Sequence, residues 1–167
     1  RTSSTPEQSF DQVNQPVAAA ARHDIVERAL AGSPATAVDA YAGLGATALA
    51  RAGRGVTVTA IESDSAAVRF AADHLPANAR ALAARVEDVI AGLLPTDVVV
   101  LNPPRAGVDS RVTDALQSST VPRVMYMSCD AATLARDVSR LPAYRVESLR
   151  AYDMFPQTAH VEVVCVL

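Results

Sequence analysis

Short apolar runs alternate along the chain with stretches whose apolar residues recur every three or four positions. The runs are typical of buried strands, and the recurring positions are typical of helices that bury one face. A helical pattern follows each of the first five runs, whereas none separates the last two. The seven predicted strands span residues 35–40, 55–62, 79–84, 96–102, 123–128, 144–152 and 159–167.

Alternation of strands and helices predicts an α/β fold, with a largely parallel sheet and helices on both faces. Because no helix separates the last two strands, we expect them to form an antiparallel pair. The prediction is therefore a Rossmann-like sheet of seven strands. Ligands of such sheets bind beyond the carboxyl ends of the strands, so each strand exit is a place to look for chemistry.

The 167 residues are expected to form one domain with a polar arm at its start. Residues 1–15 are polar, and a helical pattern begins at Pro16, with Val17, Ala21 and Ile25 spaced four apart. We therefore divide the chain into an N-terminal arm, 1–15, and a globular domain, 16–167.

Composition excludes several classes of protein. The net charge is −3, which argues against a strongly basic nucleic-acid module, although all fifteen basic residues are Arg. No apolar run approaches the roughly 20 residues of a membrane span, so no membrane association is expected. Two cysteines and three scattered histidines form no metal-binding pattern, and the simplest setting is a reducing cytoplasm.

The first two strand exits predict a nucleoside cofactor. Gly43 and Gly45 permit a tight turn and a close approach of the backbone to a ligand. Asp39 suits the cationic amino group of an amino-acid-bearing cofactor, and Glu62, nineteen residues after Gly43, can accept hydrogen bonds from ribose hydroxyls. The stretch "GLGATA" also fits a dinucleotide pattern, so a nicotinamide-dependent oxidoreductase stays an alternative.

The fourth exit reads "LNPPRAGV", where two prolines stiffen the backbone after Asn102. An amide held there can offer a donor and an acceptor to a planar ring. Asn-Pro-Pro also occurs in methyltransferases that act on exocyclic amines of nucleic acids. An aromatic residue usually follows in those enzymes, whereas Arg105 follows here.

The fifth exit and the last strand carry a thiol and a carboxylate. Cys129 lies between an apolar run and a helix expected to begin at Ala131 or Ala132, where free N–H groups stabilise a thiolate. Glu162 interrupts the final apolar run, two residues after His160 on the same face, and by itself is either a surface carboxylate of an edge strand or a partly desolvated base. Cys129 is by itself either a packing residue or a nucleophile.

Five stretches, in order and over nearly the whole chain, resemble the catalytic domain of the S-adenosylmethionine-dependent RNA 5-methyluridine (uracil-5-)-methyltransferases. They are "SFDQVNQ", "VDAYAGLGATALA", "LNPPRAGV", "YMSCDAATLARDV" and "AYDMFPQTAHVEVVCVL". The resemblance implies a class I methyltransferase fold, S-adenosylmethionine as cofactor with S-adenosylhomocysteine as product, and a flipped uridine of tRNA or rRNA as target.

The resemblance also implies roles for particular residues. Cys129 matches the nucleophile and Glu162 the proton-abstracting base, while Asn102 stands where the family commonly has Asp. Ala131 replaces a usual Pro, and Ala46 replaces a residue that is often polar. Together with the glycine loop, the expected cofactor-side residues are Gln12, Asp39, Tyr41, Gly43, Gly45, Glu62 and Asn102.

Members of that family usually carry N-terminal RNA-binding regions that have no counterpart in these 167 residues. We therefore expect the chain to be the catalytic part of a larger protein, with RNA-binding domains that this chain lacks. The alternatives are a minimal enzyme that recruits RNA in another way and a fragment that binds the cofactor without catalysis.

Overall fold

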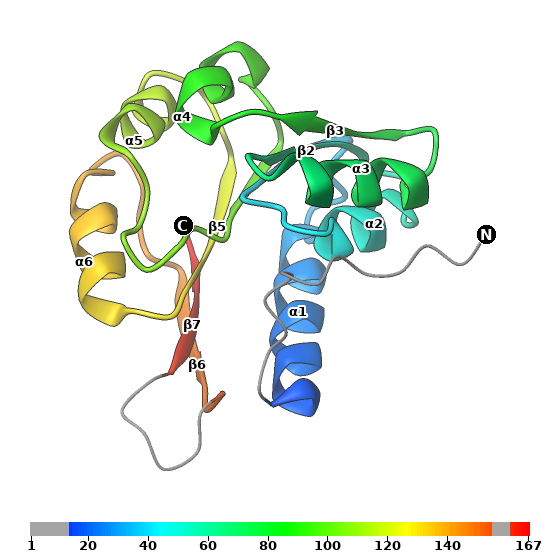
Figure 1. Ribbon diagram of the computed structural model, residues 1–167. Coiled ribbons are helices and arrows are strands. Elements are labelled where there is room, and N and C mark those ends of the chain that lie inside the picture. Colours follow the sequence, from blue (N-terminus) through cyan, green and yellow to red (C-terminus); the bar gives the residue numbers. More distant parts are fainter. Residues whose placement is uncertain (1–13, 155–160) are drawn as a thin grey trace.

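A computed structural model describes residues 14–154 and 161–167, which form one seven-stranded sheet in the order β3-β2-β1-β4-β5-β7-β6 (Figure 1). The strands are β1 (Thr36–Ala40), β2 (Thr57–Glu62), β3 (Ala79–Ala83), β4 (Val98–Leu101), β5 (Arg123–Ser128), β6 (Ser148–Tyr152) and β7 (Glu162–Val166). The helices are α1 (Gln15–Ala29), α2 (Ala46–Ala52), α3 (Ser65–His74), α4 (Val86–Val89), the 3-10 turn η1 (Ile90–Leu93), α5 (Ser110–Gln117) and α6 (Ala131–Ser139).

The central strands β1, β4, β5 and β7 are buried on both faces because they are apolar at nearly every position, whereas the edge strands β3 and β6 are partly exposed. Successive side chains of a strand point to opposite faces, and the core divides accordingly. Val99 and Leu101 pack with α5 and α6 on one face, whereas Val98 and Val100 pack with α1 and α2 on the other. Figure 1 shows the same layering, with α1, α2 and α3 on one side of the sheet and α4, α5 and α6 on the other.

The first five strands are parallel to one another, and β7 alone runs against them, because β6 is antiparallel to β7. β1 pairs with β2 on one side and with β4 on the other, so the chain order reverses between β1 and β4. In open α/β sheets such a reversal opens a crevice at the carboxyl edge. β6 and β7 form the expected antiparallel pair, and β7 is also antiparallel to β5. The predicted sheet is confirmed; the insertion of β7 between β5 and β6 was not predicted.

The first helix begins at Gln15, one residue before the predicted start. Asn14 caps it by accepting a hydrogen bond from the Val17 N–H. The buried face of this helix is slightly rotated from the predicted one through Val17, Ala21 and Ile25. Ala18 and Ala29 are buried, whereas Val17 is only half-buried. Most of the predicted arm, including Gln12, lies outside the described residues. Of the helices that the structure describes, none is long and apolar enough to cross a membrane.

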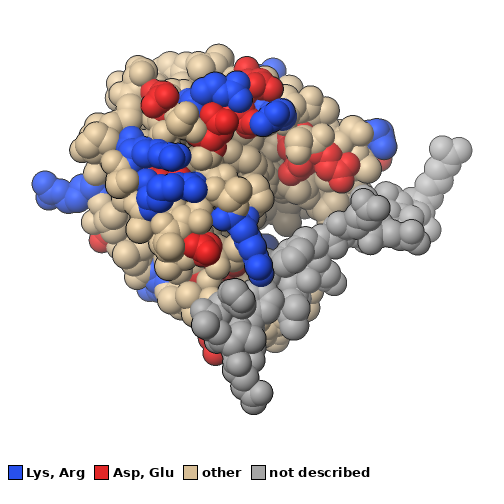
Figure 2. Space-filling model, turned by 60° about the vertical axis from the view of Figure 1, so that its left-hand side comes forward, with Lys and Arg blue, Asp and Glu red and all other residues tan. Residues whose placement is uncertain are grey.

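Arginine and carboxylate side chains are interspersed on the surface. Figure 2 shows both signs next to each other over one face of the molecule. Arg111 donates to Asp88 and Asp109 at 2.8 and 3.1 Å, and other pairs follow the same arrangement. Among the described residues of that face, the positive charge is therefore locally paired instead of forming a broad basic surface.

Candidate active site

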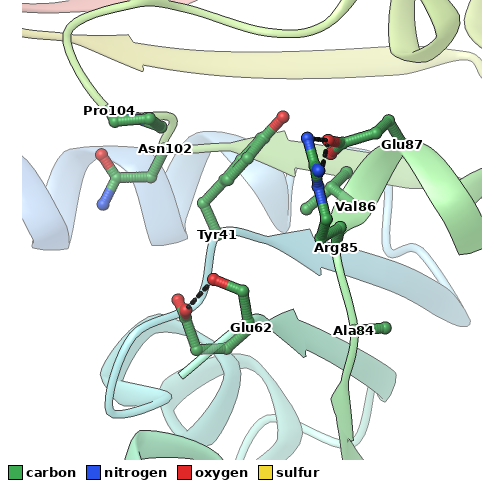
Figure 3. A pocket seen from close by; sticks show the side chains of 9 residues that line it. Tyr41, Glu62, Ala84, Arg85, Val86, Glu87, Asn102 and Pro104 are labelled. Atoms are coloured by element: carbon green, nitrogen blue, oxygen red, sulfur yellow. Dashed lines mark hydrogen bonds and ion pairs between the residues drawn. The ribbon is translucent and has the colours of Figure 1, made fainter. Parts of the chain in front are cut away.

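A cavity of about 390 Å³ lies at the carboxyl ends of β1, β2, β3 and β4 (Figure 3). Its volume falls within the range of ligand pockets, roughly 300–1,000 Å³. It occupies the place where the strand order reverses. The lining residues are Tyr41, Glu62, Ser63, Ala84, Arg85, Val86, Glu87, Asn102 and Pro104.

The glycine loop between β1 and α2 has the backbone conformation that the sequence predicted. Gly43 and Gly45 have φ of 54° and 79°, in the left-handed region that favours glycine. A Cβ at Gly43 would meet nothing within 4 Å, so the backbone there faces open space. The Gly43 N–H donates to Glu62 Oε2 at 3.0 Å, which fixes the loop relative to β2.

Glu62 lines the cavity and also holds the start of α3 through hydrogen bonds. Its Oε1 accepts from the Asp64 N–H at 2.8 Å and from the Ser63 hydroxyl at 3.1 Å. An ionised carboxylate has about four acceptor sites, and these bonds with Gly43 use three of them. One acceptor site therefore stays available to a ribose hydroxyl.

Tyr41 lies between Asn102 and the wall formed by Arg85 and Glu87, and its backbone conformation is unusual for tyrosine (Figure 3). Its φ is 60°, which costs energy for any residue with a Cβ and is common at functional sites. Burial, followed by the nearby carboxylates beginning with Glu87, raises the pKa of Tyr41 to about 12. Its ring is therefore neutral and provides an apolar wall (Figure 3).

Asn102 projects from the end of β4 into this cavity (Figure 3). Its N–H donates to the Ala40 carbonyl at 3.2 Å, which extends the β1–β4 pairing by one position. The side chain is exposed, whereas Pro103 beside it is buried and anchors the turn. Asn102 thus shares one cavity with Tyr41 and Glu62, as the strand exits predicted.

Asp39 has a different environment from the predicted one. Its side chain is 1% exposed and accepts from the Thr47 hydroxyl at 2.7 Å. Arg51 Nη2, on a fully buried side chain of α2, lies 2.7 Å from the same oxygen. The carboxylate faces inward because a buried guanidinium compensates its charge, which argues against the predicted contact with a cofactor's amino group. No sequence pattern indicated Arg51 as the partner of Asp39.

The third strand exit also contributes to the cavity, and the sequence analysis missed it. Arg85, Val86 and Glu87 follow β3 and form one wall. Arg85 forms an ion pair with Glu87, whose side chain is 8% exposed. The signal was present in "ARVED", a charged cluster directly after a predicted strand. The rule that ligands bind at strand exits would have included it.

Cys129 occupies the junction between β5 and α6. On one side Ser128 Oγ donates to the Asp130 carbonyl and accepts from the Asp130 N–H, at 2.9 and 3.1 Å. On the other side Asp130 caps α6, accepting from the Thr133 N–H at 2.8 Å. The backbone around this partly exposed thiol is therefore fixed at both ends. Cys165, by contrast, is buried in β7, and burial raises its pKa to about 11.

Glu162 begins β7 and is 5% exposed. Burial raises the pKa of its carboxyl group from the usual 4.5 to about 7. The antiparallel register of β5 and β7 ends with Ser128 opposite Val163. Continued by one position beyond the last paired residues, this register would set Cys129 opposite Glu162.

Two of the predicted residues, Gln12 and His160, lie outside the described residues, so their predicted roles stay predictions. Within residues 14–154 and 161–167, no three His, Cys, Asp or Glu side chains are grouped so as to hold a metal ion.

The cavity fits an adenosine-bearing cofactor. Glu62 retains an acceptor for a ribose hydroxyl, Ala84 and Val86 provide an apolar wall for a flat ring, and the open backbone at Gly43 admits a close approach. Together with the strand order, in which an antiparallel strand is inserted beside β5, this site defines a class I S-adenosylmethionine-dependent methyltransferase.

Comparison with known proteins identifies the family. Residues 77–167 match the model of the tRNA (uracil-5-)-methyltransferases, and residues 21–120 match that of the methyltransferase small domain. The chain belongs to the tRNA (uracil-5-)-methyltransferase family. Its cofactor is S-adenosylmethionine and not the nicotinamide nucleotide that the glycine pattern also allowed.

The relatives include longer proteins. An uncharacterized RNA methyltransferase of Streptomyces coelicolor is 41% identical over 140 residues, covering 78% of this chain and 31% of its own length. One from Enterococcus faecalis is 34% identical over 169 residues, covering 95% of this chain and 37% of its own. The chain thus spans about a third of the length of the curated relatives that it matches.

Solved structures agree with the fold. The Pyrococcus abyssi tRNA (uracil-54, C5)-methyltransferase in complex with S-adenosyl-L-homocysteine has a TM-score of 0.85 and 32% identity, covering 96% of this chain and 40% of its own. The N-methyltransferase NodS of Bradyrhizobium japonicum has a TM-score of 0.74 at 13% identity, covering 99% of this chain and 92% of its own, which shows the fold alone.

Proposed function

We propose that this chain is the catalytic part of an enzyme that methylates carbon 5 of a uridine in RNA through a covalent bond to Cys129. The observation that carries the proposal is the register of β5 and β7, which supports a thiol and a buried carboxylate facing each other across neighbouring strands. One group adds to the ring and the other removes a proton, and the reaction needs both.

The thiol is required because carbon 5 of uracil is a weak nucleophile. Cys129 attacks carbon 6 as a thiolate, forming a carbon–sulfur bond and moving the electron pair of the ring double bond toward carbon 5. S-adenosylmethionine, when bound, supplies an electrophilic methyl group. In this proposal Glu62, Tyr41 and Asn102 hold that cofactor beside the ring.

The carboxylate completes the reaction. Glu162 takes the proton from carbon 5, the electron pair re-forms the ring double bond, and the carbon–sulfur bond to Cys129 breaks. A pKa of about 7 suits this role, because a base is most effective when its pKa is near the working pH. After each turnover, Glu162 passes the proton to water.

The RNA partner is part of the proposal. A uridine inside a helix exposes neither carbon 5 nor carbon 6 to an enzyme cavity, so it must leave its stack. The paired charges in Figure 2 offer little for a phosphate backbone. We infer that regions outside this chain supply RNA contacts, that residues 16–167 are the catalytic domain and that residues 1–15 are an arm carrying Gln12.

Trapping with 5-fluorouridine tests the proposal. A base cannot remove fluorine as a proton, so RNA containing 5-fluorouridine is expected to stay covalently bound to the protein when S-adenosylmethionine is present. Cys129→Ala is expected to abolish the adduct, and Cys165→Ala serves as the matched control that keeps it. Denaturing gels and peptide mass spectrometry measure both.

Two other outcomes separate the alternatives. If Cys129→Ala still methylates RNA, the chemistry is that of an exocyclic-amine methyltransferase using Asn102-Pro103-Pro104, which needs no thiol. If the protein binds S-adenosylhomocysteine but transfers no methyl group to any unmodified RNA, even within the longer protein, the chain binds the cofactor without catalysis. Mapping the labelled nucleotide in total unmodified RNA identifies the target uridine.

A further inference from the structure

A buried carboxylate on α6 connects the two halves of the site. Asp137 lies eight residues after Cys129, and its side chain is fully buried. Its Oδ1 accepts from Arg136 at 2.7 and 2.9 Å, and Arg140 lies at 3.4 Å from the same oxygen. Its charge is therefore compensated on the solvent side, which leaves Oδ2 for partners inside the protein.

The inner oxygen joins two segments that are far apart in sequence. Oδ2 accepts from the Val108 N–H at 3.0 Å and from the Tyr126 hydroxyl at 2.6 Å. Tyr126 lies on β5, three residues before Cys129. Val108 ends the stretch that begins at Asn102 after β4, which we call the 102–108 loop.

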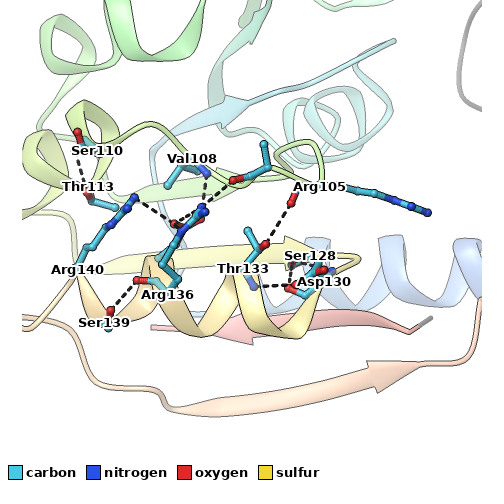
Figure 4. A network of polar contacts seen from close by, with 12 residues as sticks. Arg105, Val108, Ser110, Thr113, Ser128, Asp130, Thr133, Arg136, Ser139 and Arg140 are labelled. Carbon is cyan, nitrogen blue, oxygen red and sulfur yellow. Dashed lines mark hydrogen bonds and ion pairs between the residues drawn. The ribbon is translucent and has the colours of Figure 1, made fainter. Parts of the chain in front are cut away.

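The same helix holds the 102–108 loop at two further points (Figure 4). The Thr133 hydroxyl donates to the Arg105 carbonyl at 3.2 Å, and Arg136 donates to the Ala106 carbonyl at 2.7 Å. The loop is thus fixed through its backbone, independently of its side chains. Asn102 and Pro104, which line the cofactor cavity, belong to this loop.

Gly107 shows how closely loop and helix approach. Its φ is 81°, and a Cβ built on it would lie 2.2 Å from Asp137 Oδ2 and 2.5 Å from Thr133 Cγ2. Only glycine permits this contact. The glycine at 107 thus lets the loop backbone approach closely enough for the Val108 N–H to bond to Asp137. An apolar residue at 137 would leave that N–H without its acceptor.

Burying a carboxylate is costly even when its charge is compensated, and in some proteins such a group is retained for the specific geometry that it imposes. We propose that Asp137 is a positioning residue: it fixes the 102–108 loop against α6 and thereby sets the separation between the cofactor cavity and the Cys129 thiol. This inference rests on the proposed function. The thiol–carboxylate pair depends on β5 and β7, whereas its alignment with the cavity depends on Asp137.

That division predicts a split between two measurable reactions. Exchange of the hydrogen on carbon 5 of uridine with solvent needs Cys129 and Glu162 alone: the thiolate adds to carbon 6, carbon 5 takes a proton, the original hydrogen leaves as a proton, and the thiolate departs. Methyl transfer needs, in addition, the alignment of that pair with the cavity. A displaced loop therefore slows transfer more than exchange.

The test uses Asp137→Asn, in which one carboxylate oxygen becomes an NH2 donor, so either Val108 and Tyr126 or the arginines lose their acceptor and the charge is removed. At saturating RNA, single-turnover methyl transfer is expected to fall roughly tenfold or more, because small misplacements of reacting groups are costly. Release of label from 5-tritiated uridine, and the affinity for S-adenosylhomocysteine by calorimetry, are expected to stay within about threefold. Ile25→Val, in the core on the other face of the sheet, controls for a general loss of stability.

A second, milder pair of variants at Thr133 tests the same loop contact if Asp137→Asn does not fold. Thr133→Val removes the hydrogen bond to the Arg105 carbonyl and is expected to lower transfer about threefold, whereas Thr133→Ser keeps the hydroxyl and the rate. Unchanged transfer in both Asp137→Asn and Thr133→Val would overturn the proposal, as would transfer, exchange and affinity falling together with melting temperature. Absence of exchange in the wild type would contradict the proposed function itself and this inference with it.

Discussion

At the scale of single residues, the burial of Glu162 has the clearest chemical consequence. All residues of β7 are buried, and Glu162 is the one ionisable carboxyl group among them. Its pKa of about 7 means that it is protonated in mildly acid solution and ionised above neutrality. Both the catalytic rate and the stability of the protein are therefore expected to depend on pH through this group.

Below about pH 7, the rate of methyl transfer is expected to fall as the pH falls. The base must be ionised to take a proton, so kcat/KM for methyl transfer loses about tenfold for each pH unit below the pKa of Glu162. A pH–rate profile with saturating S-adenosylmethionine measures this limb. A profile that is flat from pH 5 to about 8 would exclude Glu162 as the base.

Stability changes in the opposite sense. Since the folded pKa is about 7 and the usual value is 4.5, the folded state binds more protons between these values, and stability falls as pH rises through that window. Glu162→Gln removes the penalty and is expected to stabilise the protein by up to about 3 kcal/mol at pH 8, with little effect at pH 4. Urea unfolding at both pH values measures the difference, and an equal effect at the two would contradict the assigned cause.

At the scale of elements, α6 connects the thiol to the rest of the site. Asp130 caps the helix in an extended conformation, with φ −137° and ψ 110°, and Ala131 is its first residue. The first N–H of a helix has no partner within the helix. A proline at this position is therefore compatible with the backbone, as it is in the family that the sequence resembles.

Ala131→Pro is expected to stabilise the protein by about 0.4–1 kcal/mol, by restricting the unfolded chain. Ala135→Pro, at an exposed position in the middle of the same helix, is the matched control and is expected to cost about 3 kcal/mol or more. Chemical denaturation measures both. Destabilisation by Ala131→Pro would show that the residue after the Asp130 cap does not have the geometry described.

At the scale of the whole molecule, the sheet brings the cavity and the thiol to one edge. Four strand exits form the cavity, and the fifth carries Cys129. In the proposed site, a cofactor in this cavity would connect segments from Tyr41 to Pro104 that are distant in sequence. A ligand that binds only the folded state stabilises the entire fold by mass action.

S-adenosylhomocysteine at a hundred times its dissociation constant is expected to add about 2.7 kcal/mol to the free energy of unfolding. For a chain of 167 residues this corresponds to a rise of about 5–10 °C in melting temperature. NAD at the same concentration is the control and is expected to cause no shift. Thermal unfolding measures both, and stabilisation by NAD alone would contradict the cofactor assignment.

The sequence by itself determined the strand–helix alternation and the position of each strand exit, because apolar periodicity and glycine geometry are local properties. The strand over 123–128 begins and ends where predicted, and the helix after Cys129 begins at Ala131, one of the two expected positions. Tyr41, Glu62 and Asn102 share a cavity, since parallel strands end at one edge.

Only the tertiary structure decided what each carboxylate faces. In the sequence, Asp39 and Glu62 are both candidate cofactor ligands near the glycine loop. In the structure, Asp39 is paired with the buried Arg51, whereas Glu62 lines the cavity. The insertion of β7 between β5 and β6, and with it the register that pairs Ser128 with Val163 next to Cys129 and Glu162, depends on long-range pairing. So do the contacts of Asp137 with Val108 and Tyr126. Local sequence patterns do not predict these long-range partners, because the burial of a carboxylate and the compensation of its charge depend on segments that are in contact only in the folded chain.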